Sequence, residues 1–189
     1  MLLSVLVMVA GLALYAAHAG GQDEKKGAEK QPNPTAVMEL EKGGTVEMEV
    51  YTTDSPITAG NFVKLAEKKF YDGVVFHRVI PGFVAQTGDP TGTGMGGPGY
   101  TIKDEKTPYK HDKGAVGMAK TSQPDSAGSQ WYICLEPQHQ LDSGYTVFGK
   151  VTKGMDLVEK IKIGDKIKTL RMKQPEAKKA DEQKPAEEK

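Results

Sequence analysis

The chain has 189 residues, and its 25 Lys and Arg are balanced by 25 Asp and Glu, so the formal net charge is zero. This length is enough for one domain with a substantial core, and the even charge balance argues against nucleic-acid binding, which usually needs a basic surface. The one cysteine, Cys134, excludes an intramolecular disulfide.

The chain begins with an apolar run over residues 2–17. This run is short for a membrane span, which needs about 20 residues, and it ends in Ala-His-Ala, a pattern that fits signal-peptide cleavage although no Lys or Arg precedes the run. We therefore predict a cleaved signal peptide over residues 1–19 and a mature start at Gly20. The alternative is an uncleaved membrane anchor formed by residues 2–17. Either interpretation exports the domain, to the periplasm or beyond the cell.

Two segments contain no large apolar residue, residues 20–35 and residues 173–189. Such segments cannot bury enough surface to fold alone, so we predict a flexible linker and a disordered charged tail. The folded unit is expected to be residues 36–172.

A β-hairpin and a helix are the first elements expected in this unit. Residues 37–40 and 45–51 alternate apolar with polar residues around a Lys-Gly-Gly turn, which predicts two antiparallel strands. Residues 54–70 then predict a helix, with Ser55 or Asp54 as its cap and a proline in its first turn. The apolar stripe of this helix consists of Ala59, Phe62, Leu65 and Ala66.

The rest of the unit is expected to form short strands, one long loop and a second helix. Residues 74–84 have strand character, and residues 87–99 are rich in glycine and proline, which indicates a loop. Further strands are expected at residues 115–119, 130–135, 146–151 and 166–172, and a helix at residues 155–162. Many short strands with two helices indicate an antiparallel barrel or sandwich with helical caps.

A His-Arg pair, His77 and Arg78, stands in the middle of the apolar stretch of residues 74–90. The apolar neighbours of Arg78 include Phe76, Val79 and Phe83, so we expect a poorly solvated guanidinium. Proteins rarely place a charge in such surroundings unless it has a partner or a task. A structural ion pair at one end of a barrel is the alternative to a functional role.

Three separated segments carry a resemblance to a known family: FYDGVVFHRVIPGFVAQTGDPTGTGMGG at residues 70–97, GAVGMAKTSQPDSAGSQWYICL at residues 114–135 and LDSGYTVFGKV at residues 141–151. Together they closely resemble the cyclophilin family of peptidyl-prolyl cis/trans isomerases. The resemblance implies a mostly β fold, an eight-stranded antiparallel barrel capped by two α-helices. It also implies a monomeric enzyme without metal or cofactor that acts on proline-containing peptides and on unfolded or partly folded proteins. The rival hypothesis is a binding module that holds such peptides without turnover.

The resemblance assigns the catalytic role to Arg78. Rotation about an X-Pro bond meets a barrier of about 18–20 kcal/mol from amide resonance, and the twisted transition state restores a lone pair on the proline nitrogen. A donor aimed at that nitrogen binds the twisted state better than the planar one. An arginine stays charged and offers several donors. The matching substrate-binding positions are Phe83, Val84, Gln86, Ala119, Gln130, Tyr132, Leu141, Tyr145 and Phe148, the last beneath or beside the proline pocket.

Several positions depart from the family pattern. Val84 stands where a methionine is common, Tyr132 replaces a phenylalanine, and Gln140 stands where some relatives have a tryptophan that contacts cyclosporin. We therefore expect weak cyclosporin binding. The sequence leaves open whether Lys120 or Thr121 contacts the substrate backbone.

Other reactive residues are given structural interpretations. His77 is expected to be a hydrogen-bonded core histidine, because the reaction needs no proton transfer, and Cys134 a buried inert thiol. The charged residues Asp104, Glu105, His111 and Asp112 match no metal-ligand spacing and are expected to lie in a solvated loop.

Overall fold

A computed structural model of the protein describes residues 32–173. It contains eight β-strands, two α-helices and one 3-10 helix. The strands are β1 (Thr35–Leu40), β2 (Thr45–Val50), β3 (Arg78–Ile80), β4 (Val84–Thr87), β5 (Ala115–Met118), β6 (Trp131–Cys134), β7 (Val147–Lys153) and β8 (Ile167–Lys173). The helices are α1 (Pro56–Glu67), α2 (Met155–Val158) and the 3-10 helix η1 (His139–Leu141).

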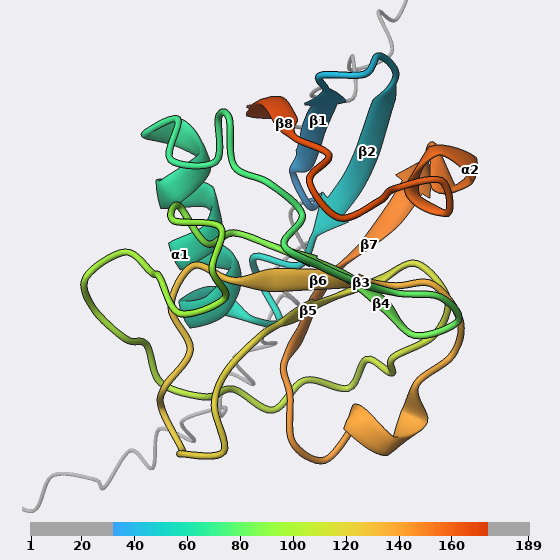
Figure 1. Ribbon diagram of the computed structural model, residues 1–189. Helices are drawn as coiled ribbons and strands as arrows, with labels where there is room; N and C mark the ends of the chain where they lie inside the picture. The colour runs from blue at the N-terminus through green and yellow to red at the C-terminus, as the bar shows by residue number, and fades with distance from the viewer. Residues whose placement is uncertain (1–31, 174–189) are drawn as a thin grey trace, which may run out of the picture.

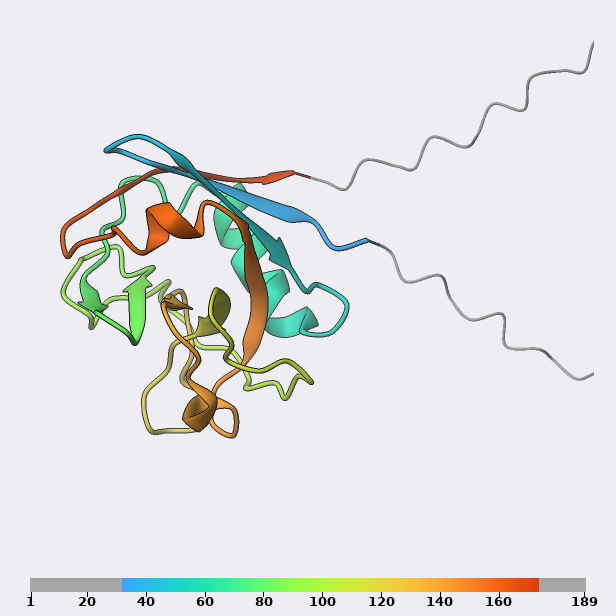
Figure 2. The same cartoon turned by 90° about the vertical axis from the view of Figure 1, so that its right-hand side faces the viewer.

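All eight strands form one antiparallel sheet in the order β3-β4-β6-β5-β7-β2-β1-β8. The sheet curls on itself, and an isolated bridge from Val75 to Lys166 joins the segment before β3 to the segment before β8. In Figures 1 and 2, β1 and β8 lie side by side, and α1 packs against the concave side of the sheet. The predicted mostly β fold with eight antiparallel strands and two helices is confirmed, as a half-barrel.

The β1–β2 hairpin forms where the alternation predicted it. The apolar face is buried, and it consists of Met38, Leu40, Val46, Met48 and Val50. The turn contains Gly43 and Gly44 at φ of 94° and 95°, a left-handed conformation that glycine adopts without strain. Leu157 of α2 packs closely on Gly44, where a Cβ would come within 2.7 Å of the leucine Cδ1.

Helix α1 buries its predicted apolar stripe, but its N-terminus is capped differently from our expectation. Ser55 is the N-cap residue and makes no side-chain cap; its hydroxyl donates to the Tyr51 carbonyl at 2.8 Å. The carboxylate of Glu105 instead accepts the backbone N–H groups of Ile57 at 3.0 Å and Thr58 at 2.6 Å. This cap comes from a loop 48 residues farther along the chain, so no local pattern could reveal it.

Two other elements are shorter than predicted. The strand character of residues 74–84 resolves into β3 and β4, separated by a turn in which Gly82 has a φ of 70°. Helix α2 covers only four of the eight expected residues, and the chain then turns toward β8. Within residues 32–173, no helix is long and apolar enough to cross a membrane; the predicted signal peptide or anchor lies outside these residues.

The sheet separates two apolar clusters. The larger, which we call the inner cluster, lies between the sheet and α1 and contains Phe62, Trp131 and Phe148 with their neighbours. The smaller, the groove cluster, contains Val84, Tyr132, Cys134 and Val147, with Leu141 packed against it. All four residues of β6 are buried because this strand supplies alternate side chains to both clusters.

Candidate active site

The site is built on one row of residues across neighbouring strands. Arg78 in β3 is paired with Gln86 in β4, Gln86 with Tyr132 in β6, and Tyr132 with Gly117 in β5. Residues directly opposite each other in antiparallel strands place their side chains on the same face of the sheet. The pairing register therefore brings the predicted catalytic arginine, a polar partner and an aromatic ring together.

A groove of about 260 Å³ lies on this face. Eight of the ten residues predicted for the site line it, together with Lys120: Arg78, Phe83, Val84, Gln86, Ala119, Tyr132, Leu141 and Tyr145. The groove therefore combines the cationic side chains of Arg78 and Lys120 with an apolar lining that includes Val84, Tyr132 and Leu141.

Arg78 lies at the rim of the groove and is exposed, which corrects the expectation of a poorly solvated guanidinium. Its Nη1 donates to Gln86 Oε1 at 3.2 Å, and its Cζ lies 5.5 Å from the centre of the Phe83 ring. The apolar neighbour Phe76 points to the other face, into the inner cluster. Arg78 therefore has a flat aromatic surface on one side and solvent on the other, within reach of a bound peptide.

Gln86 and Gln130 connect the arginine to the glycine-rich loop. Gln86 Nε2 donates to Gln130 Oε1 at 2.9 Å, and Gln130 Nε2 donates to the carbonyls of Gly94 at 3.0 Å and Gly96 at 2.9 Å. Each amide is held at both ends, so the orientation of the Arg78 guanidinium depends on the position of the loop.

The loop itself is held by the carboxylate of Asp89, which is fully buried. Its oxygens accept backbone N–H bonds from Thr91 at 2.7 Å, Gly94 at 2.6 Å and Gly96 at 3.1 Å, and a hydroxyl bond from Thr91. Burial alone would raise the pKa of Asp89, but these hydrogen bonds lower it well below its usual value of 3.8.

The apolar pocket has a rigid floor and a more open wall. Val84 and Tyr132 are almost fully buried in the groove cluster. The rings of Tyr132 and Tyr145 meet edge to face with centroids 6.2 Å apart. Leu141, the last residue of η1, adds an aliphatic side chain. An apolar hollow of this kind can hold a proline ring while the polar edge contacts the backbone.

Two predicted site residues do not line the groove. Phe148 is fully buried in the inner cluster, with its ring 5.1 Å from that of Phe62. The reason is strand alternation: on β7 it is Val147 that faces the groove cluster, so the adjacent Phe148 faces the other side. Gln130 lines a neighbouring cavity and is connected to the groove by its hydrogen bond with Gln86.

A second cavity of about 320 Å³ adjoins the groove and shares Gln86, Ala119 and Lys120 with it. Gly96, Gly97 and Thr121 also line it. Lys120 therefore borders both hollows, and its Nζ is paired with Asp104 at 3.0 Å, whereas the Thr121 hydroxyl is bonded to Ser126 at 2.8 Å. A peptide that extends from the groove would run along this cavity.

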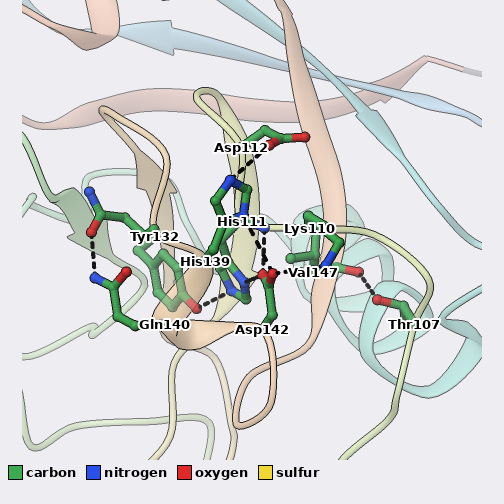
Figure 3. A network of polar contacts seen from close by, with 10 residues as sticks. Thr107, Lys110, His111, Asp112, Tyr132, His139, Gln140, Asp142 and Val147 are labelled. Atoms are coloured by element: carbon green, nitrogen blue, oxygen red, sulfur yellow. Dashed lines mark hydrogen bonds and ion pairs between the residues drawn. The ribbon is translucent and has the colours of Figure 1, made fainter.

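A buried polar network behind the pocket was missed by the sequence analysis. Figure 3 shows the Tyr132 hydroxyl beside His111, and His111 beside Asp142. His111 is fully buried, so the expectation of a solvated loop is wrong for this residue. No local signal identifies it, because His111 stands between Lys110 and Asp112 in a charged segment.

The remaining reactive residues carry no catalytic arrangement. His77 lies against Gly94, and neither ring nitrogen has a hydrogen-bond partner among residues 32–173, so it is not the hydrogen-bonded histidine that we expected. Burial raises the pKa of the Cys134 thiol to about 12, as suits a packed, unreactive side chain. The described part of the chain contains no cluster of His, Cys, Asp and Glu suited to a metal ion.

Comparison with known proteins identifies the family. Residues 35–180 match the family described as cyclophilin type peptidyl-prolyl cis-trans isomerase/CLD. The chain is 49% identical over 140 residues to peptidyl-prolyl cis-trans isomerase B of Bacillus subtilis, which covers 73% of this chain and 97% of the relative. It is 43% identical over 139 residues to a peptidyl-prolyl cis-trans isomerase of Synechococcus elongatus, which covers 72% of this chain and 94% of the relative.

A solved structure shows the same architecture. The crystal structure of a Cryptosporidium parvum cyclophilin type isomerase, in the presence of the dipeptide Ala-Pro, superposes with a TM-score of 0.69 at 30% identity. The match covers 75% of this chain and 99% of the other. With the fold, the groove and the sequence match in agreement, the chain belongs to the cyclophilin-type peptidyl-prolyl cis/trans isomerases and is an enzyme of that class.

Proposed function

We propose that the enzyme lowers the barrier to X-Pro rotation by a hydrogen bond from Arg78 to the proline nitrogen of the twisted peptide bond. The proline ring occupies the apolar pocket of Val84, Tyr132 and Leu141, and the groove wall excludes water on that side. Because the nitrogen accepts a hydrogen bond only when conjugation is lost, the interaction stabilises the transition state and not the planar ground state.

The observation that carries this proposal is the shared row of Arg78, Gln86 and Tyr132 across β3, β4 and β6. Among residues 32–173, the cationic residues that line the groove are Arg78 and Lys120, and the Lys120 ammonium is already paired with Asp104. The hydrogen bonds that link Gln86 to Gln130 hold the arginine ready before substrate arrives, which is the preorganisation that transition-state stabilisation needs.

A protease-coupled assay on an Ala-Pro-Phe peptide tests the mechanism. We expect Arg78→Ala to lower kcat/KM by about 10²–10³-fold, the usual effect of removing one donor to a transition state. Peptide binding, measured by titration, should be retained. Arg78→Lys keeps the charge and is the matched control for charge alone; because lysine lacks the planar fork, it should restore only part of the activity. Full activity in Arg78→Ala would reject the mechanism.

We also propose that the enzyme assists the folding of extracytoplasmic clients as a monomer. The support is the apolar run at residues 2–17, followed by a cleavage-like Ala-His-Ala. Mass spectrometry of the mature protein should find Gly20 at the N-terminus. If residue 1 is still present and the protein is bound to the membrane, the result would support the anchor instead. If residue 1 is still present and the protein is free of the membrane, the result would reject export. Sedimentation of the mature chain should give one copy.

Weak cyclosporin binding is the remaining proposal. Gln140 is exposed at η1 and donates to Gln138, and it offers no flat apolar surface beside the pocket. We expect a titration of the wild type to give weak binding and Gln140→Trp to bind more tightly, while isomerase activity is little changed. Nanomolar-class binding by the wild type would reject this proposal.

A further inference from the structure

The Tyr132 ring is both a wall of the proline pocket and the start of a buried hydrogen-bonded chain. Its hydroxyl lies 2.9 Å from His111 Nε2, and the two rings are nearly parallel, with an interplanar angle of 18°. Figure 3 shows this chain running from Tyr132 through His111 to Asp142. The same ring packs against Gly117, where even a Cβ would come within 2.4 Å of the tyrosine Cζ. The ring is therefore confined at its hydroxyl end and along its edge.

The second link of the chain fixes the direction of each hydrogen bond. Asp142 Oδ1 lies 2.8 Å from His111 Nδ1 and also accepts the His111 backbone N–H at 2.8 Å. An ionised carboxylate can only accept, so Nδ1 carries a proton and donates. Nε2 of the neutral ring is then an acceptor, and the Tyr132 hydroxyl donates to it.

The chain is tied to the pocket at both ends. Asp142 directly follows Leu141, which lines the groove opposite Tyr132. Two consecutive residues therefore act on the pocket: Leu141 forms one wall, and Asp142 holds the histidine. That histidine, His111, in turn holds Tyr132, which forms the other wall. A displacement of His111 would change the distance between two groups that grip the proline ring.

We propose that His111 is a positioning residue of the isomerase site, which holds the Tyr132 ring against the proline by accepting a hydrogen bond from its hydroxyl. This inference rests on the proposed proline pocket and names what keeps it in shape. His111 touches no substrate, because Tyr132 lies between it and the groove.

Charged and titratable groups from each neighbouring element face this chain. Tyr132 lies on β6, His139 begins η1, and Asp142 directly follows η1. Lys110 and Asp112 flank His111 on its own segment. Lys110 Nζ is 3.6 Å and His139 Nδ1 3.4 Å from Asp142 Oδ2, while His139 Nε2 is 3.6 Å from Asp112 Oδ1. Tyr145 meets the other side of the Tyr132 ring.

These surroundings keep His111 neutral at neutral pH. Burial lowers the pKa of His111 below its usual value of 6.5, and the Asp142 carboxylate opposes this only in part. Below that lowered pKa, Nε2 gains a proton and becomes a donor, and the Tyr132 hydroxyl, which can also accept, turns its hydrogen away and accepts from it. At neutral pH the Tyr132 hydroxyl is therefore the donor of this bond and His111 its acceptor.

Two variants separate the two links of the chain. In His111→Asn the amide can take the place of Nδ1 toward Asp142 but cannot reach Tyr132, and in His111→Gln the amide oxygen can take the place of Nε2 and accept from Tyr132. We expect kcat/KM at pH 7.5 to fall about 3- to 10-fold in His111→Asn, mainly through KM, and to recover in part in His111→Gln. Thermal unfolding of both variants reports any general loss of structure.

The decisive measurement repeats His111→Asn in the Tyr132→Phe background. Without the hydroxyl there is nothing for His111 to hold, so the further loss should be less than about twofold. An equal loss in both backgrounds would show a purely structural role and overturn the proposal, as would the absence of any loss in the first background. Arg78 is intact in all these proteins, so a failure here leaves the proposed mechanism standing, whereas failure of that mechanism appears in the Arg78 variants alone.

Imidazole ¹⁵N NMR of the wild type tests the hydrogen-bond direction without any substitution. The expected spectrum at pH 7.5 has His111 protonated on Nδ1 and unprotonated on Nε2. A proton on Nε2 at that pH would overturn the assignment. On acidification, Nε2 should gain its proton below the usual histidine pKa of 6.5, and Asp142→Asn should move this protonation to lower pH because a carboxylate that favours the imidazolium is lost.

Discussion

Strand β6 alternates between two regions of the molecule, and the two regions bury aromatic rings in different ways. Trp131 faces the inner cluster, where its ring meets Phe62 and Phe76 edge to face and its indole N–H has no partner among residues 32–173. Tyr132 faces the groove cluster, and its hydroxyl is bonded to His111. The Trp131 ring is held by packing alone, and the Tyr132 ring by packing together with a directional hydrogen bond.

The difference follows from what each face must do. The inner cluster is enclosed between the sheet and α1, and its rings are fully buried, so close packing constrains them. The groove must stay open for a peptide, so its rings lack neighbours on one side and need another constraint. Hydrogen bonds provide it: His111 holds Tyr132, and Gln86 and Gln130 hold Arg78. Substitutions on the two faces should therefore separate stability from activity.

The largest expected effect comes from neighbouring residues of β7 that face opposite sides. Phe148→Ala should lower the free energy of unfolding by about 3–5 kcal/mol, because it removes a fully buried ring from the inner cluster. Val147→Ala, on the groove side, should cost roughly 1–2 kcal/mol. Urea denaturation measures both. Similar losses in the two variants would contradict the division of β7 between the clusters.

Asp89 tests the polar constraint on the groove side. Asp89→Asn should cost about 1–3 kcal/mol at neutral pH, because the new amide N–H₂ would face the N–H groups of Gly94 or Gly96. The pKa of Asp89 is depressed on folding. Its contribution to the free energy of unfolding is therefore present above about pH 3.8 and is lost as the pH falls through the lowered pKa. The stability of the wild type should therefore decline more steeply below pH 4 than that of the variant.

The matched control for this measurement is Asp156→Asn, since Asp156 lies exposed on α2 and, within residues 32–173, its ion pair is with Lys160 at 3.8 Å. Removing this carboxylate changes the net charge by the same amount without touching the loop. If the two variants had the same acid dependence, the Asp89 contacts would not be the cause.

Gly117 tests whether the groove face tolerates added volume. Its Cβ would lie 2.4 Å from Tyr132 Cζ, so Gly117→Ala should force the tyrosine toward the groove and cost about 1–3 kcal/mol. Isomerase activity should fall with it. Gly60→Ala in α1 adds the same methyl where nothing beyond the adjoining residues and the helix's own backbone lies within 4 Å, and should stabilise the helix by about 0.5–1 kcal/mol. Calorimetry and the peptide assay check both variants; unchanged activity in Gly117→Ala would show a more yielding pocket.

The smallest effect is expected at Cys134, which shares the groove side of β6 with Tyr132. The thiol is fully buried and burial raises its pKa to about 12, so a thiol reagent at pH 8 should leave the native protein unlabelled and react only after denaturation. Rapid labelling of the native state would show that this face opens more readily than the packing indicates.

Much of the site could be predicted because it follows short-range rules. Alternation identified the buried residues of the hairpin, and periodicity identified the stripe of α1. The family motifs identified eight residues that line the groove. Phe148 was misplaced because a motif gives a position along the chain, whereas the face of the sheet depends on register. His111 and Glu105 were misread because their partners, Asp142 and the N-terminus of α1, are far away in sequence.

The sequence by itself determined the identity of the chemical groups and the strand and helix periods, since both depend on residue type and on neighbours a few positions away. It therefore determined the family and the presence of Arg78 beside an apolar pocket. Only the tertiary structure decided that Arg78 is exposed at the rim, that Phe148 belongs to the inner cluster, and that Tyr132 is held through His111 by Asp142. These features depend on strand pairing and loop closure, which bring together residues that share no local pattern.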